Sequence, residues 1–165
     1  MFRPMRRARQ ALPLERCFSI LDHGTSGVLA VSGDDGYPYA VPLSYVRVGS
    51  CLYFHCAQAG HKLDALARNP KVSFCVIGQD QVVPERFTTY YRSVIVFGTA
   101  RMIDDPEEKK KALELLAERY YPGGKAASDR EIADEFDRVC MLELSIEHIS
   151  GKQARELIPT TELEH

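Results

Sequence analysis

Apolar and polar residues alternate with a period of two along six segments of the chain, and this pattern predicts β-strands. Turn sequences separate the segments, and Gly33-Asp34-Asp35-Gly36 is the strongest of them. Because short turns join the first three segments, we expect these to form an antiparallel meander. The predicted strands span residues 27–32, 37–48, 51–57, 72–77, 93–103 and 139–149.

A period of three to four residues replaces this alternation in four other segments, which are predicted to be helices. In the first, an apolar stripe that includes Leu14 and Leu21 ends at Gly24. The third starts within Asp104-Asp105-Pro106-Glu107, which supplies cap acceptors, a first-turn proline and acidic residues at the positive helix end. The predicted helices span about residues 14–23, 60–69, 106–121 and 128–137.

Hairpin connections dominate the first half of the chain and argue against a parallel, doubly wound sheet. We therefore predict an α+β fold that is mainly β, a six-stranded antiparallel barrel with helices packed outside it. The domain is expected to span residues 14–152, after a basic N-terminal arm (1–13) and before a polar tail (153–165). We attribute Leu163-Glu164-His165 to an expression tag.

Composition and charge narrow the class of protein. With 45% hydrophobic and 27% charged residues the chain is typical of a soluble globular domain, and its net charge of -2 provides no general attraction for nucleic acid. No apolar run of about 18 residues occurs, so no membrane-spanning segment is expected, and the basic N-terminus lacks the apolar core of a signal peptide. The five cysteines include no C-x-x-C pair, which predicts free thiols in a reducing cytoplasm and no metal site.

Gly60-His61-Lys62 is the first candidate for chemistry, since it joins a predicted strand to the start of a predicted helix. A helix N-terminus attracts anions through its free N–H groups and its dipole, Gly60 would allow close approach, and Lys62 would add charge. These features predict a phosphate site, but the same residues also suit an ordinary helix start with two solvated polar side chains. His55, on the preceding strand, would donate a hydrogen bond or proton to a ligand, or would be a hydrogen-bonded sheet histidine.

Two further segments carry unusual residues. Val41-Pro42-Leu43-Ser44 places a proline inside an apolar strand, which indicates either an edge strand whose backbone faces a ligand or a bulge. Residues 78–91 form a long predicted loop that contains Tyr90 and Tyr91 and is followed closely by Ser93. Long loops in compact domains are usually functional. This one would cover an aromatic ligand, meet a second subunit, or be anchored by its own aromatic residues.

Taken together, these segments resemble the pyridoxamine 5'-phosphate oxidase-related flavin proteins, and among them the 5-nitroimidazole reductase (nitroimidazole antibiotic resistance) branch. The resemblance covers about residues 5–152 and depends on an ordered set of motifs. The motifs are Asp35 to Tyr45 (DGYPYAVPLSY), Tyr53 to Ala57 (YFHCA) with Gly60-His61-Lys62, Asn69 to Phe74 (NPKVSF), Ser93 to Gly98 (SVIVFG), and the flanking Met5-Arg6-Arg7 and His148 to Lys152 (HISGK).

The resemblance implies a split β-barrel homodimer with FMN at the subunit interface. His61 and Lys62, next to Gly60, would hold the FMN phosphate. The isoalloxazine ring would be flanked by two segments of one chain, and a third segment would come from the other subunit. These residues are Val41, Pro42, Leu43, Ser44, His55, Cys56 and Ala57 from one chain, and Tyr90, Tyr91 and Ser93 from its partner.

The leading functional hypothesis from this resemblance is an FMN-dependent oxidoreductase. A nicotinamide cofactor, NAD(P)H, or another donor would reduce FMN, which would pass electrons to a small electrophile such as a nitroaromatic compound. His55 is the candidate donor group near the flavin or the substrate. Oxidation of vitamin B6 is not expected, because the arginine-rich substrate motif of the pyridoxamine phosphate oxidases proper is not found. The alternatives are a non-catalytic module that binds or stores FMN or haem, and a related site that uses a deazaflavin.

Overall fold

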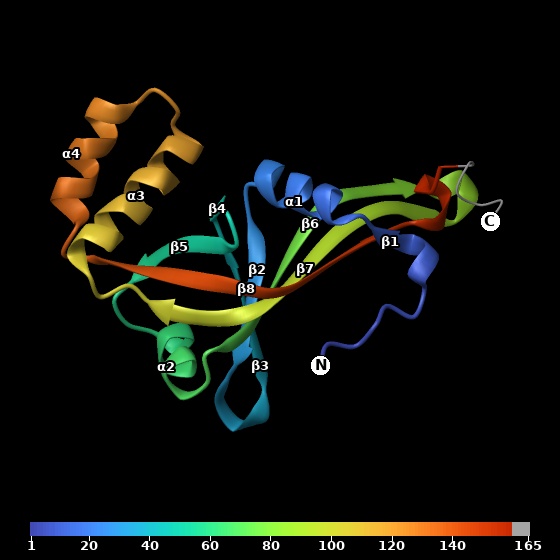
Figure 1. The fold of residues 1–165 in the computed structure, drawn as a ribbon, viewed down its shortest axis with the longest axis horizontal. Helices are drawn as coiled ribbons and strands as arrows, with labels where there is room; N and C mark the ends of the chain where they lie inside the picture. Colours follow the sequence, from blue (N-terminus) through green and yellow to red (C-terminus); the bar gives the residue numbers. More distant parts are fainter. Residues whose placement is uncertain (160–165) are drawn as a thin grey trace.

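Eight strands and four α-helices make up the part of the chain that the computed structural model describes, residues 1–159 (Figure 1). The residues attributed to a tag lie outside this range. Within it, no helix combines the length and apolar character needed to cross a membrane. The helices are α1 (Leu14–His23), α2 (His61–Arg68), α3 (Pro106–Tyr120) and α4 (Lys125–Glu135). The strands are β1 (Ala11–Leu12), β2 (Gly27–Ser32), β3 (Pro38–Leu43), β4 (Val46–Val48), β5 (Cys51–Ala57), β6 (Lys71–Val83), β7 (Thr88–Met102) and β8 (Val139–Gln153).

The strands form one antiparallel sheet in the order β3-β2-β6-β7-β8-β5-β4, with β1 added to β8. The prediction of a mainly β, antiparallel fold with peripheral helices is confirmed. The predicted six-stranded barrel is corrected in two respects: the described residues contain eight strands, and these pair as an open sheet that begins at β3 and ends at β4 rather than as a closed barrel. One extra strand, β1, lies in the segment predicted as an arm. The other arises because the predicted second strand is divided.

The predicted strand at residues 37–48 is two strands with different partners. β3 pairs with β2, whereas β4 pairs with β5 at the opposite end of the sheet order. Tyr45 stands between them, fully buried, and its hydroxyl donates a 2.6 Å hydrogen bond to the carbonyl oxygen of Leu21. The meander prediction is therefore wrong, because burial of Tyr45 turns the chain away from β2. Pro42 lies in an edge strand, which was one of the two predicted settings for it.

Residues 78–91 belong mostly to a long hairpin rather than to an irregular loop. β6 and β7 remain paired as far as Val83 and Thr88, and only Pro84 to Phe87 turn the chain. At about 3.3 Å per residue, the 13-residue β6 is roughly 40 Å long. The loop prediction is wrong because Gln79 to Gln81 are polar on both faces of the hairpin, so no apolar alternation marks the strand.

The main core lies between one face of the sheet and the helices α1 and α2. Phe54 of β5 and Phe74 of β6 meet edge to face at its centre, with ring centroids 5.0 Å apart. Strand residues on this face are almost fully buried because the sheet curves until β5 and β6, which are not neighbours in the strand order, meet across the core, and because helix side chains pack against it. The helices contribute Cys17 and Leu21 from α1, and Leu63, Ala65 and Leu66 from α2.

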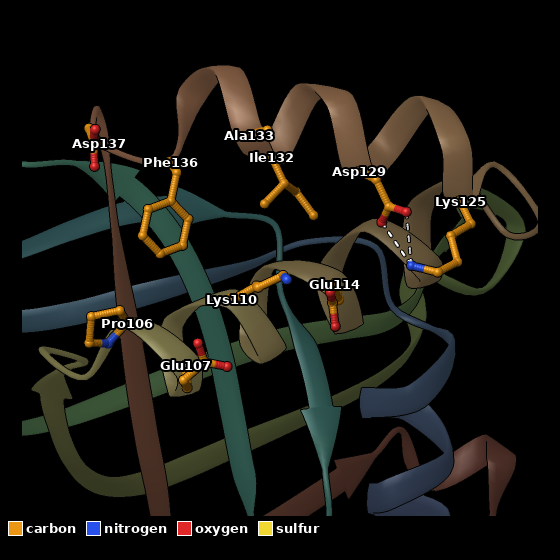
Figure 2. A pocket seen from close by; sticks show the side chains of 10 residues that line it. All are labelled: Pro106, Glu107, Lys110, Glu114, Lys125, Asp129, Ile132, Ala133, Phe136 and Asp137. Carbon is orange, nitrogen blue, oxygen red and sulfur yellow. Dashed lines mark hydrogen bonds and ion pairs between the residues drawn. The ribbon is translucent and has the colours of Figure 1, made fainter.

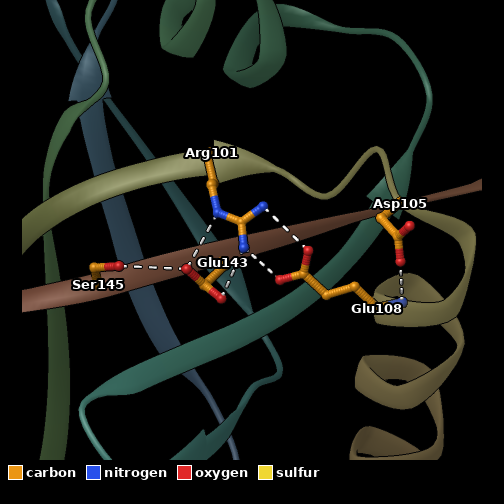
Figure 3. A network of polar contacts seen from close by, with 5 residues as sticks. All are labelled: Arg101, Asp105, Glu108, Glu143 and Ser145. Carbon is orange, nitrogen blue, oxygen red and sulfur yellow. Dashed lines mark hydrogen bonds and ion pairs between the residues drawn. The ribbon is translucent and has the colours of Figure 1, made fainter.

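An ion-pair network fastens α3 to the other face of the sheet (Figure 3). Arg101 on β7 donates two hydrogen bonds of 3.2 Å, from Nε and Nη2, to the carboxylate of Glu143 on β8. It also donates to Glu108 on α3. Glu143 is 9% exposed and accepts a further hydrogen bond from the Ser145 hydroxyl at 3.3 Å. Asp105 caps α3 as predicted, since its side chain accepts a 2.8 Å hydrogen bond from the Glu108 N–H.

Candidate cofactor-binding site

The segment that connects β5 to α2 has the strand–loop–helix form that the sequence predicts. β5 ends at Ala57, and α2 begins at His61 directly after Gly60. Gly60 has φ +133°, a conformation that glycine adopts without strain. A Cβ atom at this position would meet no atom within 4 Å, so open space remains in front of the helix N-terminus. An anionic group therefore has room to approach the first N–H groups of α2.

The imidazole of His61 is held between α2 and the β2–β3 hairpin. It stacks on the ring of Tyr39 with centroids 4.2 Å apart, and Asp34 Oδ2 lies 3.4 Å from its Nε2 atom. Nε2 is shielded from solvent and makes no hydrogen bond of good geometry. Asp34 also pairs with Arg68, at 2.5 Å. No sequence pattern marks Asp34 or Tyr39 as a partner of His61, because only the fold brings their hairpin to α2.

Lys62 is the second residue of α2, and its charge acts on Cys56 near the end of β5. It is half-buried, and within residues 1–159 no carboxylate forms an ion pair with it. Burial raises the pKa of the nearby Cys56 thiol to about 11, and the positive charge of Lys62 opposes that rise. An ammonium group without a carboxylate partner, beside a helix N-terminus, suits a phosphate ligand.

The five cysteines are free, and they do not form a metal site with other ligands. Among the described residues, no group of three or more His, Cys, Asp or Glu side chains is placed to hold a metal ion. Cys56 faces the main core, directly across from Cys140 on β8.

His55 lies on the outward face of β5, away from the main core. It is exposed, stands opposite Met141 on β8, and shares its face with Tyr53 and Ala57. Burial, assisted by the charge of Glu143, raises the pKa of Tyr53 to about 12, so its phenol remains protonated near neutral pH. Because side chains alternate, His55 and Cys56 point to opposite faces and do not present their side chains to the same ligand.

Edge strand β3 carries the other predicted ring contacts. Val41 and Leu43 pack against the main core, whereas Pro42 and Ser44 are exposed. This strand has β2 as its neighbour on one side only, so part of its backbone is free to face a ligand.

Three of the predicted contacts lie on β7 near the turn of the long hairpin: Tyr90, Tyr91 and Ser93. Within a single chain they are far from α2. Figure 1 shows α2 beside the start of β6 and the hairpin turn at the far end of the same strand. The Tyr90 hydroxyl accepts a 3.1 Å hydrogen bond from Arg86, and the Lys152 ammonium lies 5.8 Å from the ring centroid of Tyr91. The predicted contacts therefore form two separate groups in a single chain.

A separate crevice of about 600 Å³ lies between α3 and α4 (Figure 2). Its lining is mixed, with Ile132 and Phe136 on one side and charged side chains around them, and Lys125 pairs with Asp129 at 2.8 Å. None of the residues predicted from the sequence lies in it. It is a gap between two helices of a peripheral hairpin, away from the strand–loop–helix segment.

Comparison with known proteins assigns a family to most of the chain. The sequence profile described as pyridoxamine 5'-phosphate oxidase matches residues 13–153. An uncharacterized protein, RA0666, of Rhizobium meliloti (strain 1021) is 29% identical over 126 residues, which are 72% of this chain and 78% of that protein. The family prediction is confirmed by the profile.

Two solved structures illustrate the range of proteins that share this fold. A candidate 5-nitroimidazole antibiotic resistance protein from Bacteroides thetaiotaomicron VPI-5482 matches with a TM-score of 0.71 and 22% identity, covering 87% of this chain and 86% of that one. An FAD- and haem-binding protein from Mycobacterium smegmatis matches with a TM-score of 0.75 and 26% identity, covering 94% and 79% respectively.

Proposed function

We propose, from the premise that the chain belongs to the pyridoxamine 5'-phosphate oxidase family, that it is an FMN-dependent oxidoreductase. The observation that carries the proposal is the junction of β5 and α2. There, Gly60 leaves open space before a helix N-terminus, and Lys62 supplies a charge without a carboxylate partner. The phosphate of FMN suits this junction in two ways, because it is negatively charged and it is small enough for the open space.

The residues present fit the phosphate with one change to the roles expected from the sequence. Lys62 Nζ and the first main-chain N–H groups of α2 would bind the phosphate oxygens. The imidazole of His61 is engaged with Tyr39 and Asp34, so His61 would contribute its main-chain N–H and fix the position of the helix. FMN, when bound, supplies the two-electron chemistry, and the protein orients it and excludes water.

We further propose a homodimer that completes the site, because the two groups of predicted contacts are far apart in one chain. The outward face of the sheet offers an apolar surface for a second copy. Val28, Cys75 and Ile95 stand side by side on β2, β6 and β7, and Val28 and Ile95 are 39% and 38% exposed. Association through this face would bring the Tyr90–Ser93 segment of the partner toward the β5–α2 junction.

His55 is the proposed hydrogen-bond or proton donor to the flavin or to an electrophilic substrate such as a nitroaromatic compound. Its exposure on the outward face of β5 leaves both ring nitrogens accessible to a ligand. If His55→Ala retained full FMN affinity and full reductase turnover, this role would be wrong. A variant that binds FMN normally but turns over slowly would support it.

The experiment that tests FMN binding begins with the purified native protein. We expect a yellow protein with a flavin spectrum, and mass spectrometry of the released ligand should identify FMN. Lys62→Gln should weaken FMN binding about 10- to 100-fold, the usual size of a lost charge-assisted hydrogen bond, and Lys62→Glu should weaken it further. Lys111→Glu on the exposed face of α3 makes the same charge change and serves as the control. Unchanged FMN affinity in both Lys62 variants would refute the phosphate site.

A non-catalytic module that binds haem or a flavin is the second candidate, favoured by the FAD- and haem-binding protein that shares the fold at 26% identity. Anaerobic addition of NAD(P)H distinguishes the two. Bleaching of the flavin absorbance supports the reductase, whereas a stable flavin spectrum or a Soret band supports the module. A binding titration with a deazaflavin tests the third cofactor.

A further inference from the structure

Cys56 and Cys140 are direct neighbours on paired antiparallel strands, and the proposed flavin chemistry makes no use of their thiols. β5 and β8 pair in a register that sets Cys56 opposite Cys140. Both cysteines are free; Cys56 is buried and Cys140 is half-buried. Both thiols face the main core near the N-terminus of α2, close enough for each to alter the pKa of the other.

The backbone register gives the spacing of this pair. The Ile146 N–H donates a 2.9 Å hydrogen bond to the Ser50 carbonyl, which makes Ser50 and Ile146 a hydrogen-bonded pair. Hydrogen-bonded pairs alternate along an antiparallel ladder, and Cys56 follows Ser50 by an even number of residues. Cys56 and Cys140 are therefore also a hydrogen-bonded pair, with an expected Cα–Cα distance of about 5.5 Å. Disulfides span about 4.4–6.8 Å between Cα atoms, so the strands need not move apart or together to form one.

The position of the pair at the end of its ladder favours closure of a bond. Only Ala57 and Val139 pair beyond it, and the side chain of Gln58 then donates to the carbonyl oxygen of Asp137. Strand ends adjust their backbone more easily than ladder centres, because fewer hydrogen bonds resist the change. The torsion angles that an S–S bond requires can therefore be reached by small changes at this end of the ladder.

The surroundings distinguish the two sulfur atoms. Burial raises the pKa of both thiols; at Cys140 the neighbouring Cys56 thiol and the positive charges of Lys109 and Lys62 oppose that rise, whereas the charge of Asp104 adds to it. Cys140 is also the more exposed of the two. Cys140 is therefore the first to react with a small oxidant that enters from solvent, and Cys56 is placed to react second.

We infer that Cys56 and Cys140 form a redox-active dithiol that a hydroperoxide oxidises to a cross-strand disulfide. The Cys140 thiolate attacks one oxygen of the peroxide, the O–O bond breaks, and the leaving oxygen takes a proton and departs as water or an alcohol. This step leaves a sulfenic acid on Cys140. The Cys56 sulfur attacks the Cys140 sulfur, the S–O bond breaks, and water leaves with the Cys56 proton. Two electrons pass from the two sulfurs to the peroxide.

This inference is independent of the proposed function, because it needs neither a bound flavin nor a second subunit. The test uses the whole reduced protein with hydrogen peroxide as the probe. Wild-type protein should lose two hydrogen atoms in intact mass and fall from five free thiols to three, because two thiols are consumed. Peptide mapping without reduction should recover a Cys56–Cys140 crosslink. A thiol reductant should restore all five.

Variants then separate the two roles. Cys140→Ala should slow peroxide-dependent loss of the Cys56 thiol by at least about tenfold, because Cys56 is buried and lacks its partner. Cys56→Ala should leave a sulfenic acid on Cys140 that a sulfenic-acid-specific nucleophile captures. Cys51→Ala, which removes a half-buried thiol from the opposite face of β5, is the matched control and should leave the rate of crosslinking within about twofold.

Peptide mapping of the wild-type protein decides the matter even if a variant fails to fold. Oxidation confined to Cys51 or Cys75, with Cys56 and Cys140 still reduced, would overturn the inference. Conversion of Cys140 to sulfinic acid without a crosslink would also overturn it, because the two sulfurs would then be unable to meet.

Discussion

Replacing Arg101 with methionine is expected to destabilise the fold by leaving Glu143 as an unpaired buried carboxylate. Glu143 is 9% exposed, and its oxygens receive two hydrogen bonds from Arg101 and one from Ser145. Methionine retains the length of the aliphatic part of the side chain and removes the guanidinium. Water reaches Glu143 poorly, so the lost contacts cannot be fully replaced.

The expected loss follows from the exposure of the two partners. Breaking a fully buried ion pair costs about 3–5 kcal/mol, whereas exposed pairs contribute about 0–1 kcal/mol. The Glu143 side chain is 12% exposed but that of Arg101 is 49% exposed, which places this pair between the two classes. We expect a decrease of about 2 kcal/mol in the free energy of unfolding, which corresponds to a fall of about 4–8 °C in Tm for a domain of this size.

Urea denaturation of four proteins measures this coupling as a double-mutant cycle. They are the wild type, Arg101→Met, Glu143→Met and the double variant. The double variant should lose less stability than the sum of the two single losses, because no unpaired charge remains buried in it. Arg138→Met removes an exposed pair with Glu135 and should cost less than about 1 kcal/mol. If Arg101→Met cost no more than Arg138→Met, or the two losses simply added, the buried-carboxylate argument would be refuted.

Three further predictions concern the packing and the thiols. Gly98→Ala should destabilise the fold by more than about 3 kcal/mol in urea denaturation, because its Cβ would lie 2.0 Å from the Ser145 carbonyl oxygen in the paired strand. Tyr45→Phe should cost about 1–2 kcal/mol, since it leaves the buried Leu21 carbonyl without its donor; an unchanged midpoint would contradict this. Burial raises the pKa of Cys56 from 9.0 to about 11, so this thiol stabilises the fold below pH 9 by about 2–3 kcal/mol, and that contribution is lost as pH rises through 11. The free energy of unfolding of Cys56→Ala, measured as a function of pH, should lack this decrease. If the wild type and the variant had identical pH profiles, burial would not be the cause of the raised pKa of Cys56.

Local sequence signals predicted helices and strands correctly where a segment has a single hydrophobic period and a clear end signal. α1 spans the predicted residues 14–23, and α3 starts at Pro106 with Asp105 as its cap. The alternation along β5 is the expected one, since Phe54 and His55 lie on opposite faces, with Phe54 buried and His55 exposed. These features depend on residues close in sequence, for which periodicity and capping are direct physical causes.

The candidate cofactor site was predicted in part. The strand–loop–helix junction and its glycine were found because Gly60 is needed for a positive φ between two periodic segments. The contacts of the His61 ring were not predicted, because they come from Tyr39 and Asp34 on a hairpin that is remote in sequence. Whether Lys62, His55 and the partner's aromatic segment bind FMN stays a prediction.

The sequence by itself determined the four helices and most of the strands, the alternation of side chains along them, the helix start after Gly60 and the family. Only the tertiary structure decided which strands pair, because pairing depends on burial between residues that are distant along the chain. It divided the predicted strand at Tyr45 and extended the hairpin through polar residues 79–81. It also placed Cys56 opposite Cys140, since a register between β5 and β8 is set by the common core on which both strands pack.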